Sequence, residues 1–133
     1  MRSLHILLVE DNEGDILLTT EALEDIKMHI KLSVVKDGKE AIDFMNQQAL
    51  NPHSELLNLV LLDVNLPKKN GHEVLKYIKE NETLKHIPVV MLTTSSSPKD
   101  LDLAYKNAAS SYIIKPLEAG DLLEVVNRLE DHG

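Results

Sequence analysis

The feature of this sequence that most limits its fold is a series of short, uninterrupted apolar runs separated by amphipathic segments. Three such runs occur, at Leu4–Val9 (broken only by His5), Leu59–Leu62 and Val89–Leu92. Strands with a continuous apolar sequence are typical of parallel sheets, because helices cover both faces of such a sheet. The runs therefore predict three buried strands of a parallel sheet.

Two weaker patterns predict further strands. Apolar and polar residues alternate over Ile30–Val34, which indicates a strand nearer the edge of the sheet, with one face less covered. Tyr112–Ile114 is a short apolar run that ends at Lys115–Pro116. We therefore expect five strands in all.

The segments between the strands carry apolar residues with the period of an α-helix. In the last segment, one apolar stripe at positions i, i+3, i+4 and i+7 is formed by Leu122, Val125, Val126 and Leu129. Further helices are predicted over Glu13–Lys27, over Gly38–Gln48, after Gly71, and after Ser97, where a capping serine precedes Pro98.

Because strands and helices alternate along the chain, we predict an α/β fold: a doubly wound, five-stranded parallel sheet with helices on both faces. The chain has 133 residues, which fits a single domain over residues 1–133. The longest segment without a helix or strand pattern, Ala49–Asn58, is expected to be a surface loop. The last predicted helix runs almost to the end of the sequence, so we expect no output domain after it.

Composition and charge exclude several classes of protein. The sequence has no Cys, which rules out a disulfide scaffold, a cysteine-based zinc site and a thiol nucleophile. Asp and Glu number 22 against 14 Lys and Arg, and the net charge of -8 argues against a nucleic-acid partner. No apolar run approaches the roughly 20 residues of a membrane span, and the N-terminus lacks a signal-peptide pattern. We therefore expect a cytoplasmic protein with no membrane partner.

Polar residues follow or end four of the predicted strands. The first strand is followed by Glu10 and Asp11, the third by Asp63, the fourth by Thr93 and the fifth by Lys115. The carboxyl ends of parallel strands meet at one edge of a sheet, so these side chains should lie close together. Clustered carboxylates repel one another, and a hard divalent cation such as Mg²⁺ relieves that repulsion. With a hydroxyl and an ammonium nearby, the pattern predicts a site for a phosphoryl group beside a cation.

These residues, in this order, resemble the receiver domains of bacterial response regulators, and the resemblance covers essentially the whole chain. Asp63, in Leu-Leu-Asp-Val-Asn-Leu-Pro, stands where the family has its phosphoacceptor, and Glu10-Asp11 resembles its acidic metal-binding pair. The resemblance implies that the backbone carbonyl of Asn65 completes the shell of Mg²⁺ ligands, and that Gly71 matches the family's glycine at the next helix. It also implies the flavodoxin-like strand order 2-1-3-4-5.

The same resemblance assigns residues to a switch. Thr93 resembles the family's switch hydroxyl, and Tyr112 occupies the position of an aromatic residue that changes rotamer on activation in some members. Lys115 matches the lysine that precedes a typically cis proline, here Pro116.

The resemblance implies a stand-alone response regulator of a two-component phosphorelay, not an enzyme. A sensor histidine kinase would pass its phosphoryl group to Asp63 with the help of Mg²⁺. Thr93 and Tyr112 would then reshape the face formed by the fourth helix, the fifth strand and the fifth helix. The partners expected of that face are a downstream protein, a phosphotransfer protein or a second copy of the chain. The loop Ala49–Asn58 and the motif Asn-Leu-Pro-Lys-Lys-Asn-Gly are similar to those of small receiver-only regulators paired with bacterial phytochrome kinases.

Three other functions fit parts of the sequence. A Mg²⁺-dependent phosphohydrolase resembling the haloacid dehalogenase family needs a second Asp two residues after the nucleophile, where this chain has Asn65. A flavin- or nucleotide-binding domain needs a glycine-rich phosphate loop, which Glu10–Asp15 lacks. An adaptor that works without phosphorylation stays open, although the complete set of acidic, hydroxyl and lysine residues argues against it. Taken singly, Glu10-Asp11 could cap the first helix, and Tyr112 could be a partly buried aromatic residue.

Overall fold

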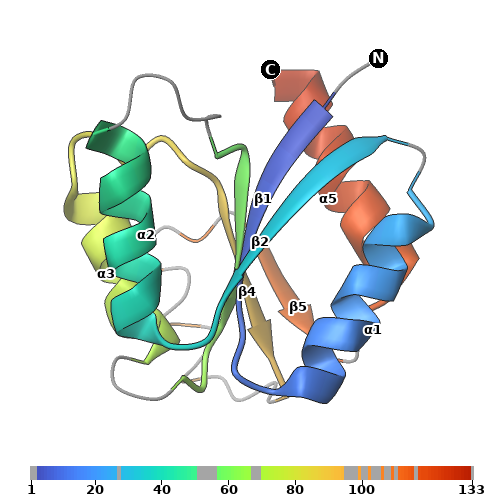
Figure 1. Ribbon diagram of the computed structural model, residues 1–133, viewed down its shortest axis with the longest axis horizontal. Helices are drawn as coiled ribbons and strands as arrows, with labels where there is room; N and C mark the ends of the chain where they lie inside the picture. Colours follow the sequence, from blue (N-terminus) through green and yellow to red (C-terminus); the bar gives the residue numbers. More distant parts are fainter. Residues whose placement is uncertain are drawn as a thin grey trace.

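The computed structural model describes residues 3–26, 28–50, 57–66, 70–94, 111–115 and 117–132, together with 99, 102, 106 and 109. Its sheet has five parallel strands: β1 (Ser3–Val9), β2 (His29–Val35), β3 (Leu59–Asp63), β4 (Val89–Thr93) and β5 (Ser111–Ile114). The strands are ordered β2-β1-β3-β4-β5, which confirms the predicted α/β fold and strand order. Their carboxyl ends lie along the lower edge of the sheet in Figure 1.

Helices cover both faces of this sheet, as the sequence predicts. The described helices are α1 (Glu13–Glu24), α2 (Gly38–Leu50), α3 (Gly71–Glu80) and α5 (Ala119–His132). Figure 1 shows α1 and α5 on one face and α2 and α3 on the other. The predicted start of a helix at Ser97 and Pro98 lies outside the described residues. None of the helices in the described part of the chain has the length and apolar character needed to cross a membrane.

Two helix ends differ from the sequence prediction. α1 ends at Glu24 and not at Lys27, because the chain turns there: the backbone N–H of Ile26 donates to the carbonyl oxygen of Leu23 at 3.1 Å. Ile26 is still buried, so it continues the apolar pattern from a turn. α2 runs on to Leu50, two residues into the predicted loop. Ala and Leu are strong helix formers, so nothing in the local sequence stops the helix there.

The core consists of two apolar layers, one on each side of the sheet. Successive residues of a strand point to opposite faces, so each strand contributes to both layers. Toward α1 and α5 the buried side chains include Ile6, Leu8, Leu61, Leu92, Leu122 and Val126. Toward α2 and α3 they include Leu7, Val9, Met45, Leu62, Leu75 and Ile78. Every residue of β3 and β4 is buried, which explains the uninterrupted apolar runs.

Candidate functional site

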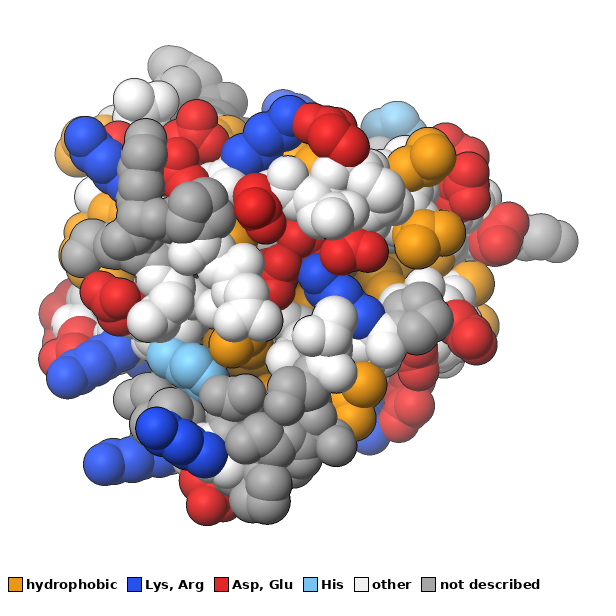
Figure 2. All heavy atoms as spheres, turned by 90° about the horizontal axis from the view of Figure 1, so that it is seen from below, with side chains coloured by type: hydrophobic (Ala, Val, Ile, Leu, Met, Phe, Trp, Pro, Cys, Tyr) orange, Lys and Arg blue, Asp and Glu red, His pale blue; other side chains and the backbone are white. Residues whose placement is uncertain are grey.

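The carboxyl ends of β1 and β3 bring three carboxylates together. Glu10 and Asp11 directly follow β1, and Asp63 is the last residue of β3. One ligand oxygen from each of the three lies within 4.8 Å of the others. Figure 2 looks at this end of the molecule, where acidic side chains gather near the centre beside a basic side chain.

Lys115, which follows β5, reaches into this cluster. Its Nζ lies 2.5 Å from Oε1 of Glu10, 2.8 Å from Oδ2 of Asp15 and 3.1 Å from Oδ2 of Asp63. The Lys115 side chain is only 10% exposed, and those of Glu10 and Asp63 are 1% and 7% exposed, so these two ion pairs are largely shielded from water. An ammonium group has three N–H donors, and here each has a carboxylate oxygen within reach.

Burial and charge alter the ionisation of this cluster. Glu10 is 1% exposed, and burial raises its pKa to about 7; hydrogen bonding to Asp63 adds to the rise, while Lys115 opposes it. Burial alone would lower the pKa of Lys115, but its hydrogen bonds to Asp15 and Glu10 and the charge of Asp63 outweigh burial and raise that pKa. Lys115 is therefore a fixed positive charge in a site with excess negative charge.

The turn after β3 holds the Asp63 carboxylate from its other side. Oδ1 of Asp63 accepts a hydrogen bond from the backbone N–H of Asn65 at 3.0 Å. The backbone N–H of Gly71, the first residue of α3, donates to the carbonyl oxygen of Val64 at 2.8 Å. A Cβ atom on Gly71 would lie only 2.2 Å from the backbone oxygen of Asp63. A glycine is therefore needed for α3 to start against this turn.

The start of α1 is capped by a residue other than the acidic pair. The side-chain oxygen of Asn12 accepts a hydrogen bond from the backbone N–H of Asp15 at 2.9 Å. The alternative in which Glu10-Asp11 caps the first helix is therefore wrong. Asn12 fills that role, and both carboxylates stay in the cluster.

The comparison with known proteins decides the family. Residues 6–127 match the model of the response regulator receiver domain. The chain belongs to this family. It is therefore a response regulator receiver of two-component signalling, as the resemblance in the sequence implied.

Two relatives of this receiver cover nearly all of its length. It is 44% identical over 127 residues to the probable methanogenesis regulatory protein FilR2 of Methanothrix harundinacea, and the matched segment covers 96% of this chain and 81% of FilR2. It is 42% identical over 125 residues to response regulator Rcp1 of Synechocystis, and the matched segment covers 94% of this chain and 85% of Rcp1.

Solved structures of similar regulators agree with the fold. The bacteriophytochrome response regulator AtBRR superimposes with a TM-score of 0.84 at 38% identity, covering 98% of this chain and 94% of AtBRR. The phosphorylated cyanobacterial phytochrome response regulator RcpA superimposes with a TM-score of 0.80 at 39% identity, covering 98% of this chain and 93% of RcpA. The Mn²⁺-bound form of Rcp1 superimposes with a TM-score of 0.77 at 42% identity, covering 95% of this chain and 91% of Rcp1.

The two residues predicted to form a switch lie on β4 and β5. Thr93 is fully buried at the end of β4, and its backbone oxygen accepts a hydrogen bond from the backbone N–H of Lys115 at 2.7 Å. In the sheet, Tyr112 pairs with Met91, and Thr93 pairs with Ile114. Residues two positions apart in a strand point to the same face, so Tyr112 and Thr93 face the same side of the sheet. Tyr112 is partly buried against the α2 and α3 layer. Pro116, expected in cis, lies outside the described residues.

One residue of the site, Asp15, was not predicted from the sequence. Its only signal is its position four residues after Asp11, in the first turn of α1. An acidic residue in the first turn of a helix already has an ordinary explanation, because it faces the positive end of the helix dipole. The pattern alone therefore gave no reason to connect Asp15 with Lys115.

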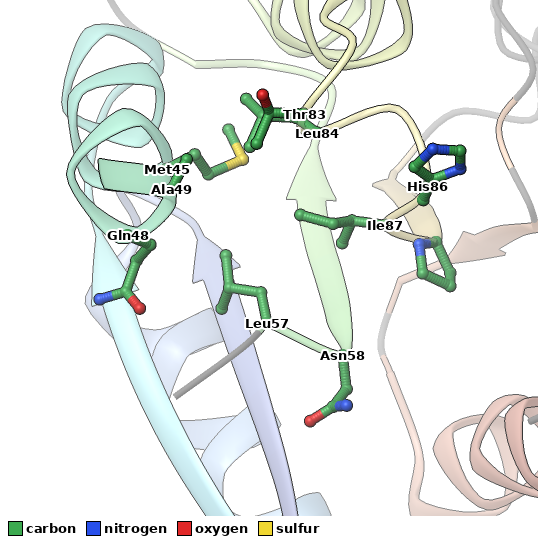
Figure 3. A pocket seen from close by; sticks show the side chains of 10 residues that line it. Met45, Gln48, Ala49, Leu57, Asn58, Thr83, Leu84, His86 and Ile87 are labelled. Atoms are coloured by element: carbon green, nitrogen blue, oxygen red, sulfur yellow. The ribbon is translucent and has the colours of Figure 1, made fainter. Parts of the chain in front are cut away.

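A pocket lies at the opposite end of the sheet from the acidic site, near the amino ends of β3 and β4. It has a volume of about 360 Å³, and its lining includes Met45, Leu57, Leu84 and Ile87 (Figure 3). Among the described residues, its lining contains one histidine and no carboxylate. It therefore offers none of the chemistry of the acidic site.

Proposed function

We propose that this receiver accepts a phosphoryl group on Asp63 from a phosphohistidine of a partner histidine kinase, in a Mg²⁺-dependent reaction. The observation that carries the proposal is that the Asp63 carboxylate lies beside both the ammonium of Lys115 and the carboxylates of Glu10 and Asp11. Among the relatives, RcpA has been captured in a phosphorylated form and Rcp1 with Mn²⁺ bound. The bacteriophytochrome regulators among the similar structures support a histidine kinase as the partner.

The residues at this edge fit a small divalent cation. The three carboxylates of Glu10, Asp11 and Asp63 provide hard oxygen donors close to one another, and this is the donor set that Mg²⁺ prefers. We propose that the backbone carbonyl of Asn65, two residues after Asp63, completes the set. When bound, the cation would supply positive charge next to the oxygens of the incoming phosphoryl group.

The chain's own residues would carry the transfer. A carboxylate oxygen of Asp63 attacks phosphorus, the phosphorus–nitrogen bond of the donor breaks, and its electron pair stays on the donor imidazole. Lys115 neutralises charge on the phosphoryl oxygens, since its ammonium already lies 3.1 Å from Oδ2 of Asp63. The protein is then a phosphoacceptor that loses the group slowly, and it acts on no separate substrate.

Phosphorylation would be read out through Thr93 and Tyr112. The added charge draws the Thr93 hydroxyl toward Asp63, and the space that it leaves lets Tyr112 turn inward from the same side of β5. This shifts an existing equilibrium between two states of the β5 and α5 face. The changed face would bind a downstream protein, a phosphotransfer partner or a second copy of the chain.

Incubation with acetyl phosphate and Mg²⁺, followed by intact-mass analysis, tests the proposal. The wild type should gain one phosphoryl group, and the gain should vanish in Asp63→Asn and in the presence of EDTA. Asp43→Asn, which removes an exposed carboxylate from α2, is the matched control and should still be modified. If the wild type gains no group and beryllofluoride causes no NMR shifts near Thr93 and Tyr112, the phosphoacceptor role is excluded.

A further inference from the structure

Lys115 has one more carboxylate partner than the proposed function uses. Two of its three contacts, to Glu10 and Asp63, are to residues that we assign to the cation. The third contact is to Asp15, at 2.8 Å, in the first turn of α1. Asp15 has no part in phosphoryl transfer or cation binding as described above, so this contact needs its own explanation.

The fold holds Asp15 and Lys115 against each other. The Asn12 cap fixes the backbone of Asp15 at the start of α1. A gap of about 10 Å³ beside the pair is lined by Asp15, Leu18, Thr19, Leu92, Lys115 and Leu117. A gap of that size holds about one water molecule at most, so the side chains at this point pack closely. The carboxylate of Asp15 is 33% exposed, so water weakens this ion pair without removing it.

The three contacts of Lys115 cannot all persist through the proposed reaction. A cation on Glu10 and Asp63 takes up carboxylate oxygens that now accept from the ammonium, and Asp15 is then the partner that remains. A phosphoryl group on Asp63 attracts the same ammonium, whose positive charge the carboxylate of Asp15 partly neutralises. Asp15 therefore acts in opposite directions at the two steps.

Building on the proposed function, we propose that Asp15 is a positioning residue for Lys115. It holds the ammonium when the cation takes the carboxylates of Glu10 and Asp63, and it competes with the phosphoryl group for the same ammonium. The pKa of Lys115 is consistent with this arrangement, because the hydrogen bond to Asp15 is the largest of the effects that raise it.

Asp15→Asn should therefore change two affinities in opposite directions. It removes a negative charge and leaves Lys115 bound more firmly to Glu10 and Asp63, so Mg²⁺ should bind more weakly. It also leaves the positive charge of Lys115 less neutralised, so beryllofluoride should bind more tightly at saturating Mg²⁺. Each change should be about 3- to 10-fold, which is the range for a charged hydrogen bond partly exposed to water.

The experiment is a titration with Mg²⁺ alone, by calorimetry, and a titration with beryllofluoride at saturating Mg²⁺, by NMR. Asp15→Glu restores the charge and should return both affinities toward the wild type. Glu21→Gln removes the same charge from an exposed position later in α1 and should change neither by more than a small amount.

The outcomes separate the role of Asp15 from a structural one. Two affinities that fall together in Asp15→Asn would indicate a damaged site, and two unchanged affinities would indicate an idle residue; either result overturns the proposal. If the wild type binds no beryllofluoride, the proposed function fails and the competition at the phosphoryl position fails with it. The Mg²⁺ titration then decides the remaining half, since an unchanged Mg²⁺ affinity in Asp15→Asn would show that Asp15 does not hold Lys115.

Discussion

At the scale of single residues, the site is defined by buried charge. Glu10 and Lys115 are 1% and 10% exposed, and a charge in such a position is costly unless it is paired. Lys115 meets three carboxylates, and Asp11 adds a fourth to the same edge. One ammonium cannot balance four carboxylates, and the excess negative charge favours either a proton on Glu10 or a divalent cation.

This competition predicts a pH dependence for Mg²⁺ binding. The pKa of Glu10 in the metal-free protein is about 7, so raising the pH through 7 removes the proton that competes with the cation. A carboxyl group of this pKa is about one-tenth ionised at pH 6 and about nine-tenths at pH 8, so Mg²⁺ should bind about tenfold more tightly at pH 8. Calorimetric titrations of the metal-free protein at the two pH values measure this difference.

Glu10→Gln provides the control for this measurement. The variant should bind Mg²⁺ more weakly at both pH values and should lose most of the pH dependence. Equal affinity of the wild type at pH 6 and pH 8 would contradict the role assigned to the Glu10 proton.

At the scale of secondary-structure elements, the approach of α3 to β3 shapes the turn that carries Asp63. α3 begins at Gly71 after the capping residue Asn70, whose side chain and that of Glu73 form a reciprocal capping box. The first turn of α3 is thereby fixed in direction. Its N-terminus lies so close to the end of β3 that a side chain at position 71 has no space.

Gly71→Ala should therefore destabilise the protein, whereas Gly120→Ala should not. A Cβ at position 71 would lie 2.2 Å from the backbone oxygen of Asp63, and relieving that overlap should cost about 1 to 3 kcal/mol. A Cβ at position 120, in α5, meets nothing within 4 Å, and alanine there should stabilise the helix by at most about 1 kcal/mol. Urea unfolding of the two variants measures both effects, and equal stabilities would show that the turn simply moves aside.

The strands and the helix ends were predictable from the sequence to different degrees. The strands were predictable, because burial on both faces leaves β3 and β4 with uninterrupted apolar sequences. The ends of the helices were less predictable. The apolar period continues to Ile26, but α1 ends at Glu24, because a turn that buries Ile26 gives the same apolar pattern as a helix. The residues at the strand ends could be proposed as neighbours from topology alone. Asp15 could not, because its contact depends on the packing of α1 beside Lys115.

At the scale of the whole molecule, the site joins segments from most of the chain. The ion pair between Lys115 and Glu10 connects residues 105 positions apart, and that between Lys115 and Asp63 connects residues 52 apart. β1, β3 and β5 must all be in place before these groups meet, so an unfolded chain offers no comparable cation site. The net charge of -8 adds a general repulsion that folding intensifies.

Divalent cations should therefore stabilise the whole fold. A ligand that binds only the folded state raises the free energy of unfolding, by about 2.7 kcal/mol when its free concentration is about 100-fold above its dissociation constant. Mg²⁺ should accordingly raise the melting temperature of the protein by several degrees, as measured by circular dichroism. Asp11→Asn removes one proposed ligand from an exposed position and should reduce this rise without lowering the melting temperature of the metal-free protein. KCl at the same ionic strength is the control for general charge screening. If KCl raises the melting temperature as much as Mg²⁺ does, the cation acts on the overall charge and not at the carboxylate cluster.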